Sequence, residues 1–532
     1  MYDAIIIGSG FGGLSSAATL AKAGKKILLL ESHVLLGGCA TCFKRKGIQV
    51  EVSLHEMDFG KEGLDMKHTL FKELDLFSRI EFLWLPSVWS IMLEESRERL
   101  TIPHQKTKDF LMELFPKEKR NIDKYFKKLH FQAFLNRKFP FMMGFWEFFF
   151  APITTLPFLA WSAFSNRSTG WMLKRLFKTS KLQKILNINL GYYHHSPFKL
   201  NWNYHAVAQN NYYHSSAYIK GGSQSLSNAL CSIIKENGGE ILTQSQVTRI
   251  LTNGNKVIGV AYENKKANAV KKSDFIFGKC VIANCDPHQV YTKMLPFNAT
   301  LKDRELTKSF TRNTSLLSIY MIFDRDLSEQ YKDMDYSTFI IKQKYFEGDF
   351  NEQEEDLLNT SLEDRGFIFV NYSKVQSNLS AKENRFLGTI TTISTYKEWE
   401  VENYAEKKEH IKTIFLERLN NVFPRILEYC IHAELATPKT IESYVQTYNG
   451  VVYGYDQSFE GFFGRERFFS KSFKNLYFAS SFGFPGGGFT GAMLSGYRTA
   501  KKILNPYFYL KRLSLCFVTG VLIGVVVFIM IS

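Results

Sequence analysis

The N-terminal part of the chain places one stretch of helical periodicity between two short apolar runs. The run "DAIIIG" has the length of a buried strand, and "KKILLLE" is a second such run that ends in an acid. Between them, in "LSSAATLAKAG", Leu14, Ala17 and Ala21 share one helical face, and Gly24 ends the pattern. This order predicts the strand–helix–strand opening of a doubly wound α/β fold with a parallel sheet.

The same kind of pattern returns in the middle and at the end of the chain. "YIKGGSQSLSNALCSIIKENGGEIL" predicts turn, helix and strand, "VTRILTNGNKVIGVAYEN" a hairpin, and "FIFGKCVIANCDP" and "NLYFAS" further buried strands. Residues 60–135 look mainly helical, and residues 290–430 mix strands with an amphipathic helix from about Glu402 to Val422. We therefore expect a discontinuous nucleotide-binding unit with other material inserted twice.

Two apolar segments interrupt this plan. After Lys511-Arg512, the run "LSLCFVTGVLIGVVVFIMIS" carries no charge and is long enough to cross a bilayer. We expect residues 511–532 to form a transmembrane tail anchor, with a buried core helix as the alternative. Basic residues precede the run, so the positive-inside rule predicts the main body on the cytoplasmic side. Residues 139–164 contain Glu147 and three prolines, which favours an interface-lying segment or a tunnel lid, with a buried helix pair as the alternative.

Charge and cysteine content narrow the class of partner. The net charge is +16, but Lys and Arg are spread along the chain in short pairs rather than in runs. This distribution argues against nucleic acid and favours attraction to anionic lipid headgroups. Cys39 and Cys42 form a C-x-x-C, for which we favour small-residue packing over dithiol chemistry, and we predict no metal site.

A phosphate-binding pattern lies at the first turn. Gly8, Gly10 and Gly13 satisfy G-x-G-x-x-G between the predicted strand and helix, and Glu31 closes the second strand. In this context the glycines allow a tight turn and close approach of a pyrophosphate, and the acid accepts hydrogen bonds from ribose hydroxyls. A second glycine pair follows soon in "GGCATCF", residues 37–43, which a nicotinamide cofactor does not need. The pair favours FAD.

The same glycine spacing occurs near the end of the chain, as Gly486, Gly488 and Gly491. No second strand and no acid follow its helix, so it cannot be an independent dinucleotide unit. We interpret "PGGG" as backbone that lies against a flat ring, with the amides of the following helix facing the flavin. One FAD would then be bound between both ends of the chain.

These pieces together resemble the carotenoid desaturase and retinol saturase family of flavoproteins, which includes phytoene desaturases, carotene isomerases and retinol 13,14-reductases. The matching stretches include "IIIGSGFGGLSSAATLAKAGKKILLLE", "GGCATCF", "YIKGGSQSLSNAL", "VIANCDP" and "PGGGFTGAMLSGYRTA", in this order. The resemblance implies a Rossmann-like FAD domain of glutathione-reductase type with an inserted α+β substrate domain. The implied boundaries are 1–75, 215–290 and 436–505 for the FAD domain, and 76–214 and 291–435 for the substrate domain.

The resemblance also implies which residues contact the cofactor. Val247, in "QVTRI", matches the residue whose backbone contacts adenine. The other expected FAD contacts are Gly8, Gly10, Gly13, Glu31, Gly38 and Cys39 at the start of the chain, and Gly488, Thr490, Gly491 and Met493 at the flavin ring.

The chain departs from the family where flavin and substrate are expected to meet. Glu51 and Ser53 stand where an aromatic, an Asp and a Gly often occur, and His55 follows. His55 and Glu51 are the candidates for proton handling. The resemblance implies hydride transfer between FAD and an apolar polyene or isoprenoid lipid at a membrane, with a quinone, oxygen or NAD(P)H as electron partner. An amine-oxidase-like flavoenzyme and a non-catalytic membrane flavoprotein or lipid carrier are the alternatives.

Overall fold

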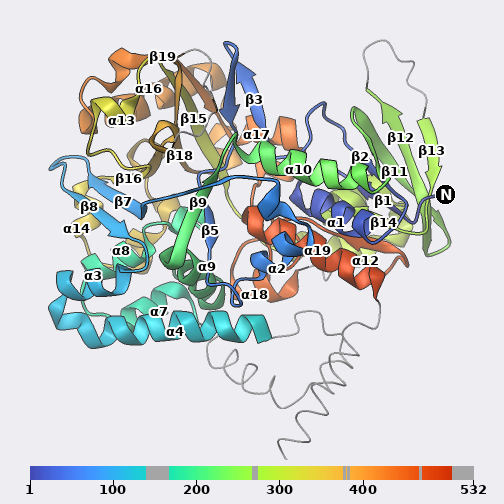
Figure 1. Ribbon diagram of the computed structural model, residues 1–532, viewed down its shortest axis with the longest axis horizontal. Coiled ribbons are helices and arrows are strands. Elements are labelled where there is room, and N and C mark those ends of the chain that lie inside the picture. The colour runs from blue at the N-terminus through green and yellow to red at the C-terminus, as the bar shows by residue number, and fades with distance from the viewer. Residues whose placement is uncertain (139–166, 266–272, 376–378, 380–383, 466–469, 506–532) are drawn as a thin grey trace, which may run out of the picture.

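The computed structural model describes residues 1–138, 167–265, 273–375, 379, 384–465 and 470–505 of the chain (Figure 1). The segments 139–164 and 511–532, expected to lie on or cross a membrane, fall outside these residues. Among the described helices, none combines the length and the apolar character that crossing a bilayer requires.

A five-stranded parallel sheet forms the half at the right of Figure 1. The sequence predicts that the nucleotide binds here, and we call it the nucleotide-binding half. Its strands come from the start, the middle and the end of the chain, which confirms the α/β class and the discontinuous unit expected from the sequence. The strand order is β10 (Glu240–Leu242), β2 (Ile27–Leu30), β1 (Ala4–Ile7), β14 (Val281–Ala283) and β20 (Leu476–Phe478).

The two faces of this sheet are covered differently, because alternate side chains of each strand point to opposite faces. Ile6 and Leu29 lie in the core with α1 (Phe11–Lys22), α10 (Ser223–Glu236) and α19 (Gly488–Leu504). Ile5 and Leu28 lie in a second core with the antiparallel sheet β11 (Ser245–Asn253), β12 (Lys256–Asn264) and β13 (Ser273–Phe277).

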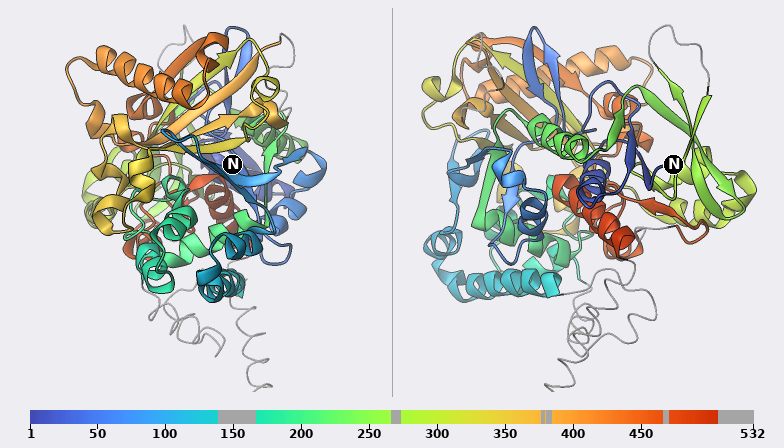
Figure 2. Two further views of the ribbon diagram at one scale, coloured as in Figure 1. Left: turned by 90° about the vertical axis from the view of Figure 1, so that its left-hand side faces the viewer. Right: turned by 45° about the vertical axis from the view of Figure 1, so that its right-hand side comes forward.

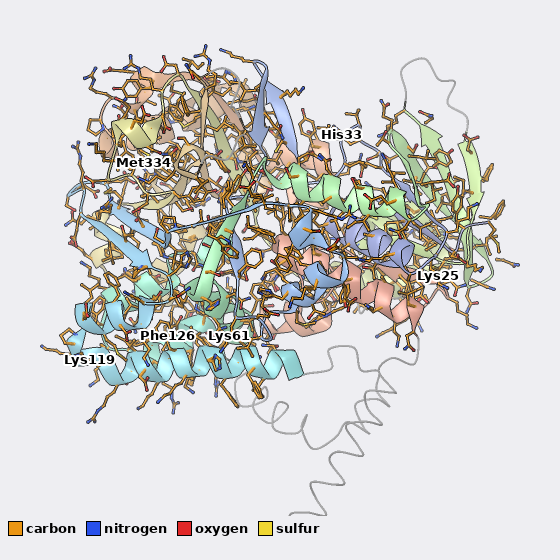
Figure 3. The ribbon with its side chains drawn as sticks, viewed as in Figure 1. Lys25, His33, Lys61, Lys119, Phe126 and Met334 are labelled. Atoms are coloured by element: carbon orange, nitrogen blue, oxygen red, sulfur yellow. The ribbon has the colours of Figure 1, made fainter. Side chains whose placement is uncertain are left out.

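A seven-stranded mixed sheet forms the other half, at the upper left of Figure 1. The helix expected from about Glu402 is α16 (Tyr404–Val422), and it covers one face of the sheet, where Met334 is buried (Figure 3). The opposite face contributes Tyr320, Phe339 and Ile368 to the same hydrophobic core that contains Ile6 and Leu29. The order is β19 (Cys430–Ala436), β15 (Ser315–Phe323), β18 (Phe386–Ser394), β17 (Phe367–Asn371), β16 (Ser337–Ile341), β7 (Ser87–Leu93) and β8 (Arg99–Pro103).

The prediction that residues 60–135 are mainly helical is wrong for their central part. This part forms β6 (Phe82–Trp84), β7 and β8, whereas α2 (Met66–Glu73), α3 (Thr107–Leu114) and α4 (Lys119–Lys138) are helical as expected. Strand β7 is buried at every position and therefore lacks the polar–apolar alternation that identifies a strand. Its parallel partner β16 lies far along the chain, so local sequence carries no sign of the pairing.

Shorter strands and several helices lie between the two large sheets. Strand β5 pairs with β9, and β3 pairs with β4. Helix α9 contacts both α4 and β5, and α4 runs along the lower edge in Figure 1. The bounds are β3 (Cys42–Arg45), β4 (Ile48–Glu51), β5 (Met57–Phe59), β9 (Ser215–Ile219), α7 (Thr169–Leu176), α8 (Ser180–Asn187), α9 (Trp202–His214), α14 (Gln343–Glu347), α15 (Glu352–Glu355) and α17 (Pro438–Val445).

Candidate active site

One cavity of about 760 Å³ extends from the nucleotide-binding half into the half formed by the seven-stranded sheet. Its wall includes Gly8 and Gly10 of the first turn as well as Gly486 and Gly488 of the last. The two glycine-rich ends of the chain therefore border a common space. Helices α1 and α19, which follow these turns, lie side by side in both views of the nucleotide-binding half (Figures 1 and 2).

The first turn is too close-packed for any side chain at two of its glycines. A Cβ at Gly13 would lie 2.1 Å from the Gly8 carbonyl oxygen, and a Cβ at Gly12 would lie 2.1 Å from the Ala479 carbonyl oxygen. Within the described residues, no side chain caps the N-terminus of α1, and its first turn holds no acid. The free amides of this helix end are suited to an anionic phosphate.

Glu31 directly follows β2 and stabilises the first turn through hydrogen bonds. Its Oε2 accepts hydrogen bonds from the Ser9 amide at 2.7 Å and the Ser9 hydroxyl at 2.6 Å, and its Oε1 accepts from the His33 amide at 2.8 Å. The carboxylate is 8% exposed and borders the cavity. Carboxylate oxygens accept more than one hydrogen bond each, so ribose hydroxyls can still bind here.

The second glycine pair packs directly onto the first turn. The Gly37 amide donates to the Ser9 hydroxyl at 3.1 Å, and a Cβ at Gly38 would lie 3.2 Å from the Gly10 Cα. Burial raises the pKa of the Cys39 thiol to about 11 and also raises that of Cys42. Reactive dithiols need lowered pKa values, so these thiols fit the packing role expected of them.

The last glycine turn repeats the local geometry of the first. A Cβ at Gly491 would lie 1.8 Å from the Gly486 carbonyl oxygen, the relation that Gly13 has to Gly8. No side chain among the described residues caps α19, and none of their atoms lies within 4 Å of a Cβ built at Gly488. The turn thus offers bare backbone and free amides to the cavity.

A buried ionic cluster supports the start of α19. The Thr490 hydroxyl donates to Asp58 Oδ1 at 3.3 Å, and the Lys67 ammonium lies 2.9 Å from both Asp58 and Asp65. The Lys67 side chain is 2% exposed, and the Asn211 amide also donates to Asp58, at 2.9 Å. This cluster holds β5 beside the segment expected to contact the flavin ring.

The two candidates for proton handling occupy different surroundings. The Glu51 carboxylate accepts from the Ser223 amide and hydroxyl, each at 2.7 Å, and from Tyr218 at 3.1 Å. Glu51 is absent from the described cavity wall. Its hydrogen bonds therefore suit a structural role, in which the carboxylate joins the end of β4 to the start of α10. His55 does border the cavity, and burial lowers its pKa to about 4, so the imidazole is neutral at pH 7.

Glu56, which sequence reasoning missed, is the carboxyl group that borders the cavity beside His55. Its Oε1 accepts from the Tyr192 hydroxyl at 3.0 Å and its Oε2 from the Ser337 hydroxyl at 2.8 Å. Tyr192 in turn lies 3.2 Å from His55 Nδ1. Burial raises the pKa of Glu56 to about 7, because desolvation outweighs these hydrogen bonds. A group that titrates near 7 is suited to give or take a proton.

The structure brings most of the expected cofactor contacts to one wall. Gly13 and Met493 stand behind it: Gly13 packs on Gly8, and the Met493 carbonyl accepts a 2.9 Å hydrogen bond from the Ser15 hydroxyl. Their contact with flavin stays a prediction, as does that of the residues that border the cavity, namely Gly8, Gly10, Glu31, Gly38, Cys39, Val247, Gly488, Thr490 and Gly491.

Comparison with known proteins decides the family. The pattern of the family described as "Flavin containing amine oxidoreductase" matches residues 11–504. The chain belongs to this family. It is an FAD-dependent oxidoreductase, and its cofactor is FAD.

Relatives of this flavin containing amine oxidoreductase are similar over most of their length. The all-trans-retinol 13,14-reductase of Danio rerio is 24% identical over 96% of this chain and 88% of that protein. The Homo sapiens protein of that name is 27% identical over 85% and 77%. The chloroplastic prolycopene isomerase of Daucus carota is 25% identical over 94% and 80%.

Solved structures share the fold of this family member. Putrescine oxidase bound to putrescine has a TM-score of 0.59 at 13% identity, covering 94% of this chain and 99% of that one. An oxidoreductase from Methanosarcina mazei has a TM-score of 0.57 at 15% identity, covering 94% and 99%. At these identities the likeness concerns the fold alone.

The residues of this chain fit FAD on three counts. Two turns are so close-packed that a Cβ at Gly13 or Gly491 would overlap backbone. Two helix N-termini without side-chain caps in the described structure border one cavity. Val247, 3% exposed, borders the same cavity at an irregularity of the β11–β12 pairing, so the residue expected at the adenine lies on the wall that also carries the first glycine turn.

Proposed function

We propose that the chain transfers a hydride between FAD and an apolar polyene or isoprenoid lipid, in a saturation, desaturation or isomerisation. The observation that carries this proposal is the cavity itself, which continues from the two glycine turns into a largely apolar interior. Apolar and aromatic lining suits an unsaturated lipid and offers little to a small polar amine. The interior wall includes Leu190, Tyr192, Val207, Phe339, Phe346 and Ile368.

The relatives support the same substrate class. Their names specify all-trans-retinol and prolycopene, which are both long unsaturated lipids. The solved amine oxidase shares the fold but is 13% identical, so its substrate gives no argument for this chain.

FAD, when bound, would supply or accept the hydride. The glycine turns would hold the cofactor, and the apolar part of the wall would keep water from the reacting carbons. Saturation of a double bond adds a hydride to one carbon and a proton to the other. In this direction, the Glu56 carboxyl would give its proton to the carbon that does not receive the hydride. Tyr192 and Ser337 orient this carboxyl, and Glu56 directly precedes β5, two residues before Asp58, the partner of Thr490.

An anaerobic assay of the full chain tests the proposal. The reduced holoprotein is mixed with all-trans-retinol, and the flavin spectrum and the product mass are recorded. We expect reoxidation of the flavin together with a product heavier by two hydrogens, or an isomer of unchanged mass for a cis-polyene. A parallel assay mixes the oxidised holoprotein with putrescine in air. Hydrogen peroxide release in that assay, together with no reaction with any polyene, would instead establish an amine oxidase.

We also propose that the chain is anchored by residues 511–532, with its body on the cytoplasmic side of a membrane. The lower edge of the described structure supports this, because α4 combines cations with exposed aromatic rings (Figure 3). Phe131 and Phe134 are 48% and 42% exposed, and Lys127 lines the same shallow hollow. Such a surface suits anionic headgroups and the acyl boundary. Alkaline extraction and protease protection of the full chain in membranes test both points; release by alkali would contradict the anchor.

A further inference from the structure

A buried cation lies directly behind the last glycine turn. Arg465 follows α18 (Phe459–Gly464), which is labelled below α2 in Figure 1. The residue is 2% exposed. A Cβ built at Gly486 would lie 2.1 Å from Arg465 Nη1, 2.2 Å from its Cζ and 2.8 Å from its Nε. These distances place the flat face of the guanidinium group against Gly486, the first glycine of the turn that borders the cavity.

The hydrogen bonds of Arg465 go to backbone carbonyl groups. Its Nη2 donates to the carbonyl oxygens of Tyr455 at 2.8 Å and Asp456 at 2.7 Å, and its Nη1 donates to that of Ser481 at 3.1 Å. Within the described structure the guanidinium group forms no ion pair, and the Asp456 carboxylate attracts it from beyond ion-pair distance. Carbonyl groups carry no net charge, so these hydrogen bonds do not neutralise the cation.

Burial makes this charge costly to keep. Desolvation lowers the pKa of Arg465 to about 10, against the opposing effects of Tyr204 and Asp456, so the side chain is still a cation at pH 7. Arginine is rarely buried to this extent without a paired carboxylate. A neutral glutamine also donates to carbonyl groups, so hydrogen bonding alone does not explain a cation at this position. The unpaired charge indicates a role toward negative charge that develops nearby.

The flavin ring is the group in which such charge would develop. Arg465 packs on Gly486, and Gly486 borders the cavity, so glycine backbone stands between the cation and the place expected for the ring. An oxidised flavin ring is neutral, whereas a reduced ring carries negative charge around its pyrimidine end. A fixed cation in a buried setting stabilises the charged form more than the neutral form. The free amides at the start of α19 act in the same direction.

We propose that Arg465 raises the reduction potential of the bound FAD by placing a fixed positive charge behind the last glycine turn. It is a positioning residue, which supports Gly486 and contributes its charge through the turn without contacting flavin or substrate. This inference rests on the proposed function for the place of the flavin ring, and it holds whichever substrate the chain takes. A higher potential makes the flavin a stronger hydride acceptor and a weaker hydride donor.

Two substitutions separate the charge of Arg465 from its hydrogen bonds. Arg465→Gln keeps donors but removes the charge, and Arg465→Lys keeps the charge but removes the planar donor group. The potential of the full-chain holoprotein is measured anaerobically against a reference dye. We expect Arg465→Gln to lower the preference for reduced over oxidised FAD by about 10-fold, which corresponds to about 30 mV for a two-electron couple. Arg465→Lys should keep most of the wild-type potential. Melting temperature and flavin content verify folding.

A wild-type potential in folded Arg465→Gln would overturn the inference, and so would an equal decrease in both variants, because the hydrogen bonds rather than the charge would then matter. The wild-type holoprotein gives a second measurement that does not depend on the folding of a variant. Its reduced flavin should stay anionic at pH 7, as read from the absorbance spectrum, and a neutral reduced flavin would contradict the proposal. Neither measurement uses a substrate, so failure of every polyene to react would contradict the proposed function alone.

Discussion

The two glycine-rich turns have the same local geometry but different continuations. In each, the third glycine of the pattern packs against the carbonyl of the first, as Gly13 does with Gly8 and Gly491 with Gly486. The first turn continues into β2 and Glu31, whereas α19 ends at Leu504 without a following strand in the described chain. The pattern thus specifies a close-packed helix start facing a ligand, and the surroundings specify which part of the ligand lies there.

The strongest effect is expected from closing either turn. Gly13→Ala and Gly491→Ala would each place a Cβ within about 2 Å of a backbone oxygen, at 2.1 and 1.8 Å. Since backbone on both sides is fixed by packing, we expect each variant to lose its flavin. The ratio of flavin absorbance to protein after purification measures this.

Gly191→Ala is the control for these two substitutions. Its Cβ would meet only the Ile393 side chain, at 3.4 Å, among the described atoms, so the variant should keep its flavin. If Gly491→Ala retained full flavin while Gly13→Ala lost it, the last turn would not contribute to cofactor binding.

Substitutions of Glu56 and Glu31 should separate an effect on the reaction rate from an effect on FAD affinity. Glu56→Gln removes the proton but keeps the shape, so we expect saturation to slow by about 100-fold, with the FAD dissociation constant unchanged. Because burial raises the pKa of Glu56 to about 7, the wild-type rate should be high at low pH and fall as pH rises through 7. Pre-steady-state rates across pH 5–9 measure the profile, which should be flat for Glu56→Gln. A Glu56→Gln profile identical to wild type would exclude Glu56 as the donor.

The raised pKa of Glu56 also predicts that the folded protein is more stable at low pH. The folded pKa lies above the ordinary value of 4.5, so the stability that protonated Glu56 contributes is complete below pH 4.5. It is lost progressively as pH rises toward 7. Glu56→Gln should therefore melt with a smaller pH dependence between these values than wild type.

Glu31→Ala should act on affinity instead of rate. The substitution leaves the Ser9 amide, the Ser9 hydroxyl and the His33 amide without their acceptor and removes the group expected to bind ribose. We expect FAD affinity to fall by about 10-fold, with the rate of the reconstituted enzyme close to wild type. Equilibrium reconstitution of apoprotein measures the dissociation constant; an unchanged constant would contradict the assignment.

The smallest effect concerns the contact between the two helices that follow the turns. Ser15→Ala removes the hydrogen bond from Ser15 Oγ to the Met493 carbonyl, which spans 2.9 Å. A loss of about 1 kcal/mol in the free energy of unfolding is expected, since the packing of Phe11 on Phe489 remains. Denaturant unfolding of the holoprotein measures it. A loss several times larger would show that this bond, rather than the glycine packing, joins the turns.

The sequence predicts those parts of the fold whose defining residues all lie within one short stretch of the chain. The first turn was predictable because three glycines, an apolar strand and Glu31 all lie within one short stretch. Strand β7 was not, since its burial on both faces depends on β16 and on a core assembled from distant segments.

The candidate site divides in the same way. His55 and Glu51 stand out in sequence as departures from a family pattern, but Glu51 proves to be held by Ser223 and Tyr218. Glu56 directly follows His55, yet its raised pKa depends on burial beside Tyr192 and Ser337, which no local pattern indicates.

The most direct test of the account is an experimental structure of the full chain with its cofactor. We predict one FAD per chain, with the pyrophosphate at Gly8–Gly13 and the isoalloxazine ring against Gly486–Gly491. Two separate dinucleotides, or a flavin ring placed away from the last glycine turn, would contradict the claim that both ends of the chain bind one cofactor.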